Sequence, residues 1–190
     1  RVGVWRLFDM FDKHQIRATV SLGLANFIHY PEIFQACQDR DWSIMCHGIY
    51  NTRYHWNMTE DQERSAIAEC VDLYGEMTGK KIAGWFSPAA SYTLRTPDLV
   101  AEAGIKYYCD WHHDDQPTPI NLRSGKKFVS IPYSLEMNDT IAYVVNKIEP
   151  RRYGQIIKDN FDRLYEEGAE NGTVMCIPTH NYQVSCPHRL

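Results

Sequence analysis

Several features are missing from this 190-residue sequence, and each absence excludes a class of protein. No stretch reaches the roughly 18 consecutive apolar residues of a membrane-spanning helix, and the first residues show no secretory signal pattern. Charge is balanced, with 20 Lys+Arg against 24 Asp+Glu and a formal net charge of -4, so no basic surface for nucleic acid is expected. We therefore expect neither a membrane nor a nucleic acid as partner.

The cysteines lack the C-x-x-C spacing of a metal or redox motif. A disulfide-stapled framework would belong to a small secreted domain, and this chain is longer than those domains are. Most of the cysteines lie in or beside apolar runs, where a reduced thiol behaves as a small hydrophobe. We expect a cytoplasmic protein in which six thiols are free: Cys37, Cys46, Cys70, Cys109, Cys176 and Cys186.

The composition is that of a folded domain with an excess of aromatic residues. Hydrophobic residues make up 44% and charged residues 23%, and the length suits one domain spanning residues 1–190. Aromatic residues reach 13%, with 5 Trp and 12 Tyr, which is more than a core alone needs. Such an excess is typical of a pocket for a flat or ring-shaped ligand.

Helix and strand patterns alternate along the chain, which predicts an α/β fold with a mostly parallel sheet covered by helices. The polar tract 111–124 is read as a long loop, and periodicity alone leaves both a barrel and an open sheet possible. The expected strands span 17–22, 42–46, 82–86, 106–109, 128–131 and 173–177.

The helix predictions depend on apolar spacing and on terminal signals. Thr59 with Gln62 forms a capping box before the clearest helix, which Gly79 ends. Thr96 is read as the cap of a further helix. The remaining helices are expected from Val4 to Phe11, from Pro31 to Cys37 and from Tyr153 to Leu164.

Polar residues follow the expected strands at their carboxyl ends, where parallel α/β folds gather their ligand sites. Histidines, carboxylates and amides converging there would suit acid–base chemistry on a carbonyl. Each of them can also be read as a cap, a turn residue or a solvent-exposed side chain. The candidates are His47, Asn51, Ser87, Asp110, Trp111, Glu136, Asn138, Asp139 and His180.

A separate cluster, His112-His113-Asp114-Asp115, has the composition of a metal site. Neighbouring residues on an extended loop point in opposite directions, however, so a solvated acidic loop is the better interpretation.

Several of these segments resemble motifs of the NodB-homology polysaccharide deacetylases, carbohydrate esterase family 4, and their order along the chain is also similar. Within that family the chain is most similar to the branch of the PuuE-type allantoinases. The segments that match the family motifs are His47-Gly-Ile-Tyr-Asn51, Trp85-Phe-Ser-Pro-Ala89, Cys109-Asp-Trp111 and Ile177-Pro-Thr-His180. The likeness to the branch rests on Asn51-Thr52-Arg53, Asp110 through Pro117 and Pro132 through Asp139.

The resemblance implies a distorted (β/α) barrel and hydrolysis of a non-peptide carbon–nitrogen bond. His180 would protonate the departing nitrogen, because histidine changes charge near neutral pH. His47 would bind a metal or polarise the carbonyl, and Asp110 would orient His180 or the substrate. The remaining candidates would contact substrate: Asn51, Ser87, Trp111, Glu136, Asn138 and Asp139.

The chain also departs from the family pattern. The family's paired aspartates, which include its general base, would precede Arg1, so we expect the chain to lack the first strand. The last residues, 186–190, show no capped final element, so we expect truncation at that end as well. Asn51 stands where the second metal-binding histidine belongs, so we expect no metal or a weakly bound divalent ion such as zinc. His55 and His113 are alternative donors that could complete the set.

Three functions remain open. A cyclic ureide such as allantoin and an N-acetylated sugar compete as small-molecule substrate, and a cytoplasmic location favours the ureide. A non-catalytic binding domain on a degenerate barrel is the alternative, and the resemblance also implies a homo-oligomer, a tetramer.

Overall fold

The computed structural model describes residues 2–190, which form two compact units. We call residues 17–111 and 118–131 the sheet unit. The helical unit comprises the described residues up to Ile16 together with residues 112–117 and 132–190. One domain over the whole chain stays a prediction, and each unit is described by itself.

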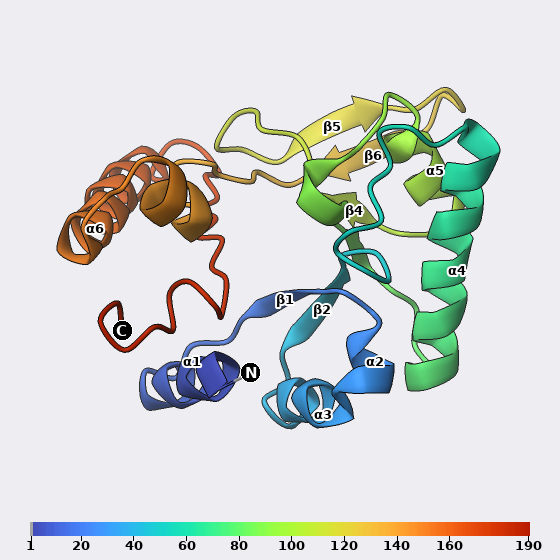
Figure 1. The fold of residues 1–190 in the computed structure, drawn as a ribbon. Coiled ribbons are helices and arrows are strands. Elements are labelled where there is room, and N and C mark those ends of the chain that lie inside the picture. The colour runs from blue at the N-terminus through green and yellow to red at the C-terminus, as the bar shows by residue number, and fades with distance from the viewer. Residues whose placement is uncertain (1) are drawn as a thin grey trace. The chain divides into compact units, whose positions relative to one another are not determined.

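A six-stranded sheet in the order β1-β2-β3-β4-β6-β5 forms the centre of the sheet unit (Figure 1). The first four strands and β6 run parallel, and β5 pairs antiparallel with β6 at the edge. The register between β1 and β2 places Leu22 opposite Cys46, so both strands end at the same level. The strands are β1 (Thr19–Leu22), β2 (Ser43–Cys46), β3 (Gly84–Trp85), β4 (Tyr107–Tyr108), β5 (Thr118–Asn121) and β6 (Lys127–Ser130).

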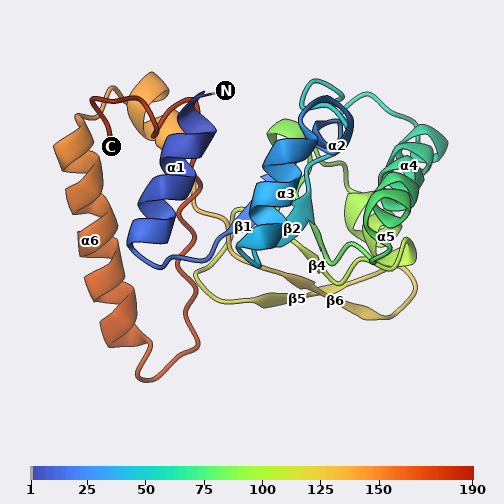
Figure 2. The same ribbon diagram turned by 90° about the horizontal axis from the view of Figure 1, so that it is seen from below.

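Helices α2 (Asn26–His29), α3 (Pro31–Asp39), α4 (Glu60–Thr78) and α5 (Thr96–Glu102) connect these strands and flank the sheet (Figures 1 and 2). Local signals define α4 most fully. Thr59 and Gln62 form the reciprocal capping box, acidic residues occupy the first turn, and Gly79 ends the helix in the left-handed conformation.

The core of the sheet unit lies between α4, α5 and the strands. Ile67, Cys70 and Tyr74 of α4 share the i, i+3, i+7 spacing of one helix face, and all three are buried. They belong to the same cluster as Trp85 and Tyr108 from the neighbouring strands, both fully buried. Each large aliphatic side chain buried in this way contributes about 1.5–3 kcal/mol to folding.

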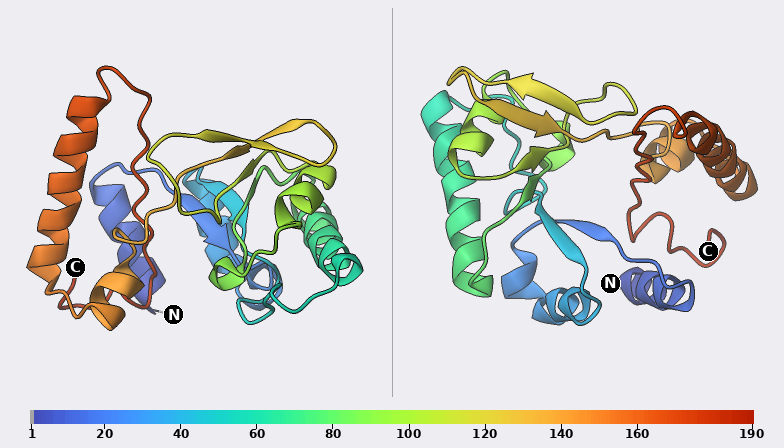
Figure 3. Two further views of the ribbon diagram at one scale, coloured as in Figure 1. Left: turned by 90° about the horizontal axis from the view of Figure 1, so that it is seen from above. Right: turned by 180° about the vertical axis from the view of Figure 1, so that it is seen from behind.

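The helical unit contains α1 (Val2–Lys13), a π-helical turn (Ile141–Val145) and α6 (Pro150–Glu167). After α6 the chain turns back, as Figure 3 shows, and the Thr173 hydroxyl donates to the carbonyl of Leu164 at 3.0 Å. No helix within residues 2–190 has both the length and the apolar character needed to cross a membrane.

The α/β prediction is confirmed, but three local predictions are wrong. Residues 118–121 of the expected loop form β5, because they find a partner in β6 across a short turn. Residues 173–177 form no strand, since no strand within residues 2–190 pairs with them. Thr96 is the first residue inside α5, and Arg95 takes the cap position without a side-chain hydrogen bond.

All six cysteines are free thiols, as the sequence predicted.

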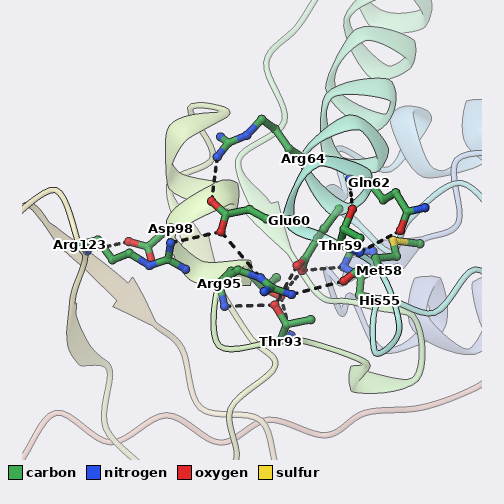
Figure 4. A network of polar contacts seen from close by, with 12 residues as sticks. His55, Met58, Thr59, Glu60, Gln62, Arg64, Thr93, Arg95, Asp98 and Arg123 are labelled. Carbon is green, nitrogen blue, oxygen red and sulfur yellow. Dashed lines mark hydrogen bonds and ion pairs between the residues drawn. The ribbon is translucent and has the colours of Figure 1, made fainter.

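A buried carboxylate, Glu63, joins α4 to two loops of the sheet unit. Figure 4 labels two of its partners, His55 and Thr93, within the surrounding network of polar contacts. Its Oε1 accepts from His55 Nδ1 at 3.2 Å and from the Thr96 hydroxyl, and its Oε2 accepts from the Thr93 hydroxyl at 2.8 Å. His55 is itself 2% exposed, and its backbone N–H donates to Ser91 Oγ at 3.0 Å. Burial raises the pKa of Glu63, but the hydrogen bonds from His55, Thr96 and Thr93 leave it below its usual value.

We predict that Glu63→Ala lowers the free energy of unfolding by about 3–5 kcal/mol, because it leaves buried donors unpaired. The matched control is Glu69→Ala, which removes only the exposed pair with Arg53 and should cost less than about 1 kcal/mol. Urea denaturation at neutral pH measures both.

The lowered pKa of Glu63 also determines how the stability of the protein depends on pH. Stabilisation by Glu63 is present above the unfolded carboxyl pKa of about 4.3 and is lost as the pH falls through the lower folded value. Glu63→Gln should lack this acidic component of the stability profile. Equal losses in the Glu63 and Glu69 variants would contradict this role for Glu63.

Candidate active site

His47 stands directly after β2, as the strand pattern predicts. The chain turns at once because Gly48 adopts a φ of +69°, which favours glycine. A Cβ on Gly48 would also lie 2.7 Å from Pro88 Cγ. The glycine therefore allows the loop after β3 to approach the histidine closely.

The ring of His47 is held by the same loop. Its Nδ1 lies 2.8 Å from the carbonyl oxygen of Phe86, and its ring stacks on the Phe86 ring with centroids 5.1 Å apart. A carbonyl oxygen only accepts, so Nδ1 carries the proton and the neutral ring presents Nε2 as its acceptor atom. This is the tautomer that a metal-binding or proton-accepting histidine needs.

The second position of the family's metal pattern does not complete a metal site. Asn51 is exposed, and its amide oxygen is a poor zinc ligand beside an imidazole. The alternative donor, His55, has its Nδ1 bonded to Glu63 in the core. Within the described residues 2–190, no group of three or more His, Cys, Asp and Glu side chains is placed to hold a metal ion. The donors present thus do not fit a three-ligand zinc site.

Asp110 and Ser87 form a buried pair after β4 and β3. The backbone N–H of Ser87 donates to Asp110 Oδ1 at 2.6 Å, and the Ser87 hydroxyl donates to Oδ2 at 2.6 Å. Trp85 Nε1 donates to the same hydroxyl at 2.9 Å. Both members of the pair are fully buried.

This environment makes Asp110 a proton carrier near neutral pH. Burial raises the pKa of Asp110 to about 6, and the hydrogen bonds from Ser87 limit the rise. Because the folded pKa is raised, the folded state holds the proton more tightly, and stability falls as the pH rises from the unfolded value through about 6. A carboxyl group that titrates here is suited to acid–base work.

Trp111 follows Asp110 and is partly buried against the core of the sheet unit. Its ring meets that of Tyr108 edge to face, with centroids 5.8 Å apart. Burial and the nearby Asp110 charge raise the pKa of Tyr108 far above its usual value, so its hydroxyl stays protonated.

His180 pairs with Asp139 in the helical unit. His180 Nδ1 lies 2.6 Å from Asp139 Oδ1, and the His180 backbone N–H donates to Oδ2 at 2.7 Å. Asp139 is fully buried, whereas the His180 side chain is 34% exposed. The carboxylate accepts from the Nδ1–H group, which leaves Nε2 as the ring nitrogen that can exchange a proton.

Thr140 and Asn138 support this pair, and the sequence did not indicate the first of them. The Thr140 hydroxyl lies 3.2 Å from His180 Nδ1. Asn138 Oδ1 accepts from the backbone of Thr140 at 2.8 Å, and its Nδ2 donates to the Tyr133 hydroxyl at 2.7 Å. The amide of Asn138 is therefore engaged within the chain, and substrate contact by it stays a prediction.

The candidates thus divide between the two units. The sheet unit brings Ser87 and Asp110 together, and the helical unit brings Asp139 and His180 together. Asp139, expected in a pocket wall, is the carboxylate partner of His180, whereas Asp110 bonds to Ser87. His47, Asn51 and Trp111 lie in the sheet unit, and Glu136 and Asn138 lie in the helical unit.

Comparison with known proteins decides the family. The sequence pattern of the polysaccharide deacetylases matches residues 2–108. The chain belongs to the polysaccharide deacetylase family. This confirms the resemblance carried by the motifs around His47 and Trp85, and the family is one of hydrolases.

Individual relatives of this deacetylase-family chain share its fold. A PuuE allantoinase is 30% identical and superimposes with a TM-score of 0.89, covering 98% of this chain and 62% of that one. A probable polysaccharide deacetylase from Pseudomonas aeruginosa is 31% identical, with a TM-score of 0.88 and the same coverage. The peptidoglycan deacetylase of Helicobacter pylori is 28% identical over 78% of this chain. The chain spans 50% of that curated relative.

We predict that Ser87→Ala raises the pKa of Asp110 above about 6, because it removes the hydroxyl that favours the charged carboxylate. A carbon-13 carboxyl NMR titration measures the shift. Ser65→Ala, a change at an exposed serine of α4, is the control and should leave the titration unchanged. A pKa that stays or falls in Ser87→Ala would show that the hydroxyl does not stabilise the charge.

We also predict that the dialysed protein carries well below one zinc ion per chain, because Asn51 and His55 do not complete a ligand set with His47. Mass spectrometry of metal content, with assays in chelator, measures this. Asn51→His should increase zinc retention. Stoichiometric zinc in the unchanged protein, with activity lost to chelator and restored by the ion, would refute the prediction.

Proposed function

We propose that this chain contributes to hydrolysis of a non-peptide carbon–nitrogen bond in a small cyclic ureide such as allantoin, in the cytoplasm. The observation that carries the proposal is the pairing of partly exposed His180 with fully buried Asp139 through two hydrogen bonds. The carboxylate holds this histidine in one tautomer and leaves its second nitrogen facing away. Such a histidine is suited to act as a general acid that protonates a leaving group.

In this mechanism His180 donates its Nε2 proton to the departing nitrogen. Asp139 accepts from the Nδ1–H group and thereby holds the ring in one orientation for the transfer. Proton transfer from a positioned side chain of this kind contributes roughly 100- to 10,000-fold to a rate.

The sheet unit, taken by itself, contains two groups that can hold a proton. With its Nδ1 donating to the Phe86 carbonyl, His47 can exchange a second proton only at Nε2. It polarises a carbonyl only when that nitrogen is protonated. Asp110, with a pKa of about 6, is the second group that can hold a proton near neutral pH.

The cyclic ureide is supported by the likeness to a PuuE allantoinase along 98% of this chain. An N-acetylated sugar is the second candidate, and one observation favours it. Tyr54 and Trp56 are 44% and 58% exposed with ring centroids 5.3 Å apart, and exposed aromatic faces suit stacking on sugar rings. The relative from Helicobacter pylori is named a peptidoglycan deacetylase.

A direct activity screen separates these substrates. The protein is assayed with allantoin, N-acetylglucosamine oligomers and simple formamides, following ring opening or release of acetate or formate. Turnover of allantoin alone supports the ureide, and release of acetate alone supports the sugar. Binding without turnover of any of them would support the non-catalytic binding domain.

We predict that His180→Ala lowers kcat by about 100- to 10,000-fold while the protein stays folded. Asp139→Asn should also reduce kcat, because the amide no longer holds the His180 ring in the required tautomer. His188→Ala is the control, since this exposed histidine lies in the same terminal segment. Activity within about tenfold of the parent in folded His180→Ala would exclude the general-acid role.

A further inference from the structure

The helical unit contains a cavity that none of the assigned roles explains. Its volume is about 210 Å³, and three segments line it: residues 112–115, residues 132–137 and residues 174–176, with α6 contributing Asn160. The backbone N–H of Val174 donates to the carbonyl of Asp115 at 2.7 Å and joins two of these walls. We call it the Glu136 cavity.

The lining of the Glu136 cavity is rich in hydrogen-bond acceptors. Glu136 contributes a carboxylate, to which the Ser134 hydroxyl donates at 3.2 Å, and Asp114 and Asp115 add two more. Residues 112–115 are exposed, as the sequence predicted for a solvated loop, and they also line this cavity. Burial lowers the pKa of His112, and the Glu136 charge opposes this only in part, so the ring is largely neutral at neutral pH.

A short chain of hydrogen bonds connects the cavity to the acid pair. Tyr133 lines the cavity, with its ring 5.5 Å from that of His112, and its hydroxyl accepts from Asn138 Nδ2. Asn138 accepts in turn from the backbone of Thr140, whose hydroxyl lies 3.2 Å from His180 Nδ1. The cavity wall and His180 are therefore parts of one bonded arrangement within one unit.

The volume of the Glu136 cavity limits the size of the ligand that it can bind. A cavity of about 210 Å³ lies below the roughly 300–1,000 Å³ of pockets for drug-sized ligands. It suits a molecule or group of few non-hydrogen atoms and cannot enclose an oligosaccharide.

We infer that the Glu136 cavity binds the ureido group of the substrate, with the Glu136 carboxylate accepting hydrogen bonds from its N–H groups. The inference rests on the proposed function and specifies the part of the substrate that is recognised in the unit that carries His180. A ureido group is planar, small and rich in N–H donors, so it matches an acceptor-rich lining. A sugar hydroxyl both donates and accepts, so it uses only its donor capacity opposite the three carboxylates.

The test measures binding in a His180→Ala background, in which turnover does not interfere. Isothermal titration calorimetry compares allantoin with N-acetylglucosamine as probes. Glu136→Gln keeps the shape of the side chain and removes its charge, and it should weaken allantoin binding about 10- to 100-fold. The matched control, Glu166→Gln on the exposed end of α6, should leave the Kd unchanged.

A second variant tests the cavity by its volume. Asn160→Phe fills the space from α6 and should abolish allantoin binding, whereas Lys158→Phe on the exposed face of the same helix should not. Circular dichroism verifies that both variants fold. An unchanged allantoin Kd in Glu136→Gln and in Asn160→Phe, or no binding of allantoin by the parent, overturns the inference.

The outcomes also separate this inference from the proposed function. Binding that depends on Glu136, without hydrolysis of allantoin by the unmodified protein, would retain the subsite and reject the reaction. Hydrolysis with an unchanged KM in Glu136→Gln would retain the reaction and reject the subsite.

Discussion

A carboxylate removed from water has to find its hydrogen-bond donors inside the protein, and this constraint shapes both units. Glu63, Asp110 and Asp139 are each fully buried. Every one of them draws donors from segments distant in the sequence, by 33 residues for Glu63 and Thr96, 23 for Asp110 and Ser87, and 41 for Asp139 and His180. Satisfying these groups determines where the loops after the strands lie.

The three carboxylates face different donors, and their chemistry differs accordingly. Glu63 bonds to an imidazole and two hydroxyls in the core, which favours its charge and makes it a structural anchor. Asp110 meets only neutral donors in a dry environment, so its pKa rises to about 6. Asp139 meets a partly exposed imidazole, which gives the molecule its clearest acid–base pair.

Elements with strong local signals were predictable. The capping box of Thr59 and Gln62, the apolar face of α4 and Gly79 at its end depend on residues close in sequence. Two strand predictions were wrong for the same physical reason. Residues 118–121 form β5 although a loop was predicted, and residues 173–177 form no strand although one was predicted. A strand exists only where a neighbour supplies its hydrogen bonds, and β6 supplies them to residues 118–121.

The sequence alone determined the family, the alternation of helices and strands, and the candidate residues at strand ends, because these depend on local patterns and on motifs in order. It named both members of the pairs Ser87–Asp110 and Asp139–His180, yet it offered Asp110 as a partner for His180. Only the tertiary structure shows which carboxylate bonds to which donor. It also shows that His55 is bonded to Glu63 in the core and that His112 lines the Glu136 cavity. Side-chain pairing across such sequence separations depends on how strand ends and loops pack in space, which local patterns do not encode.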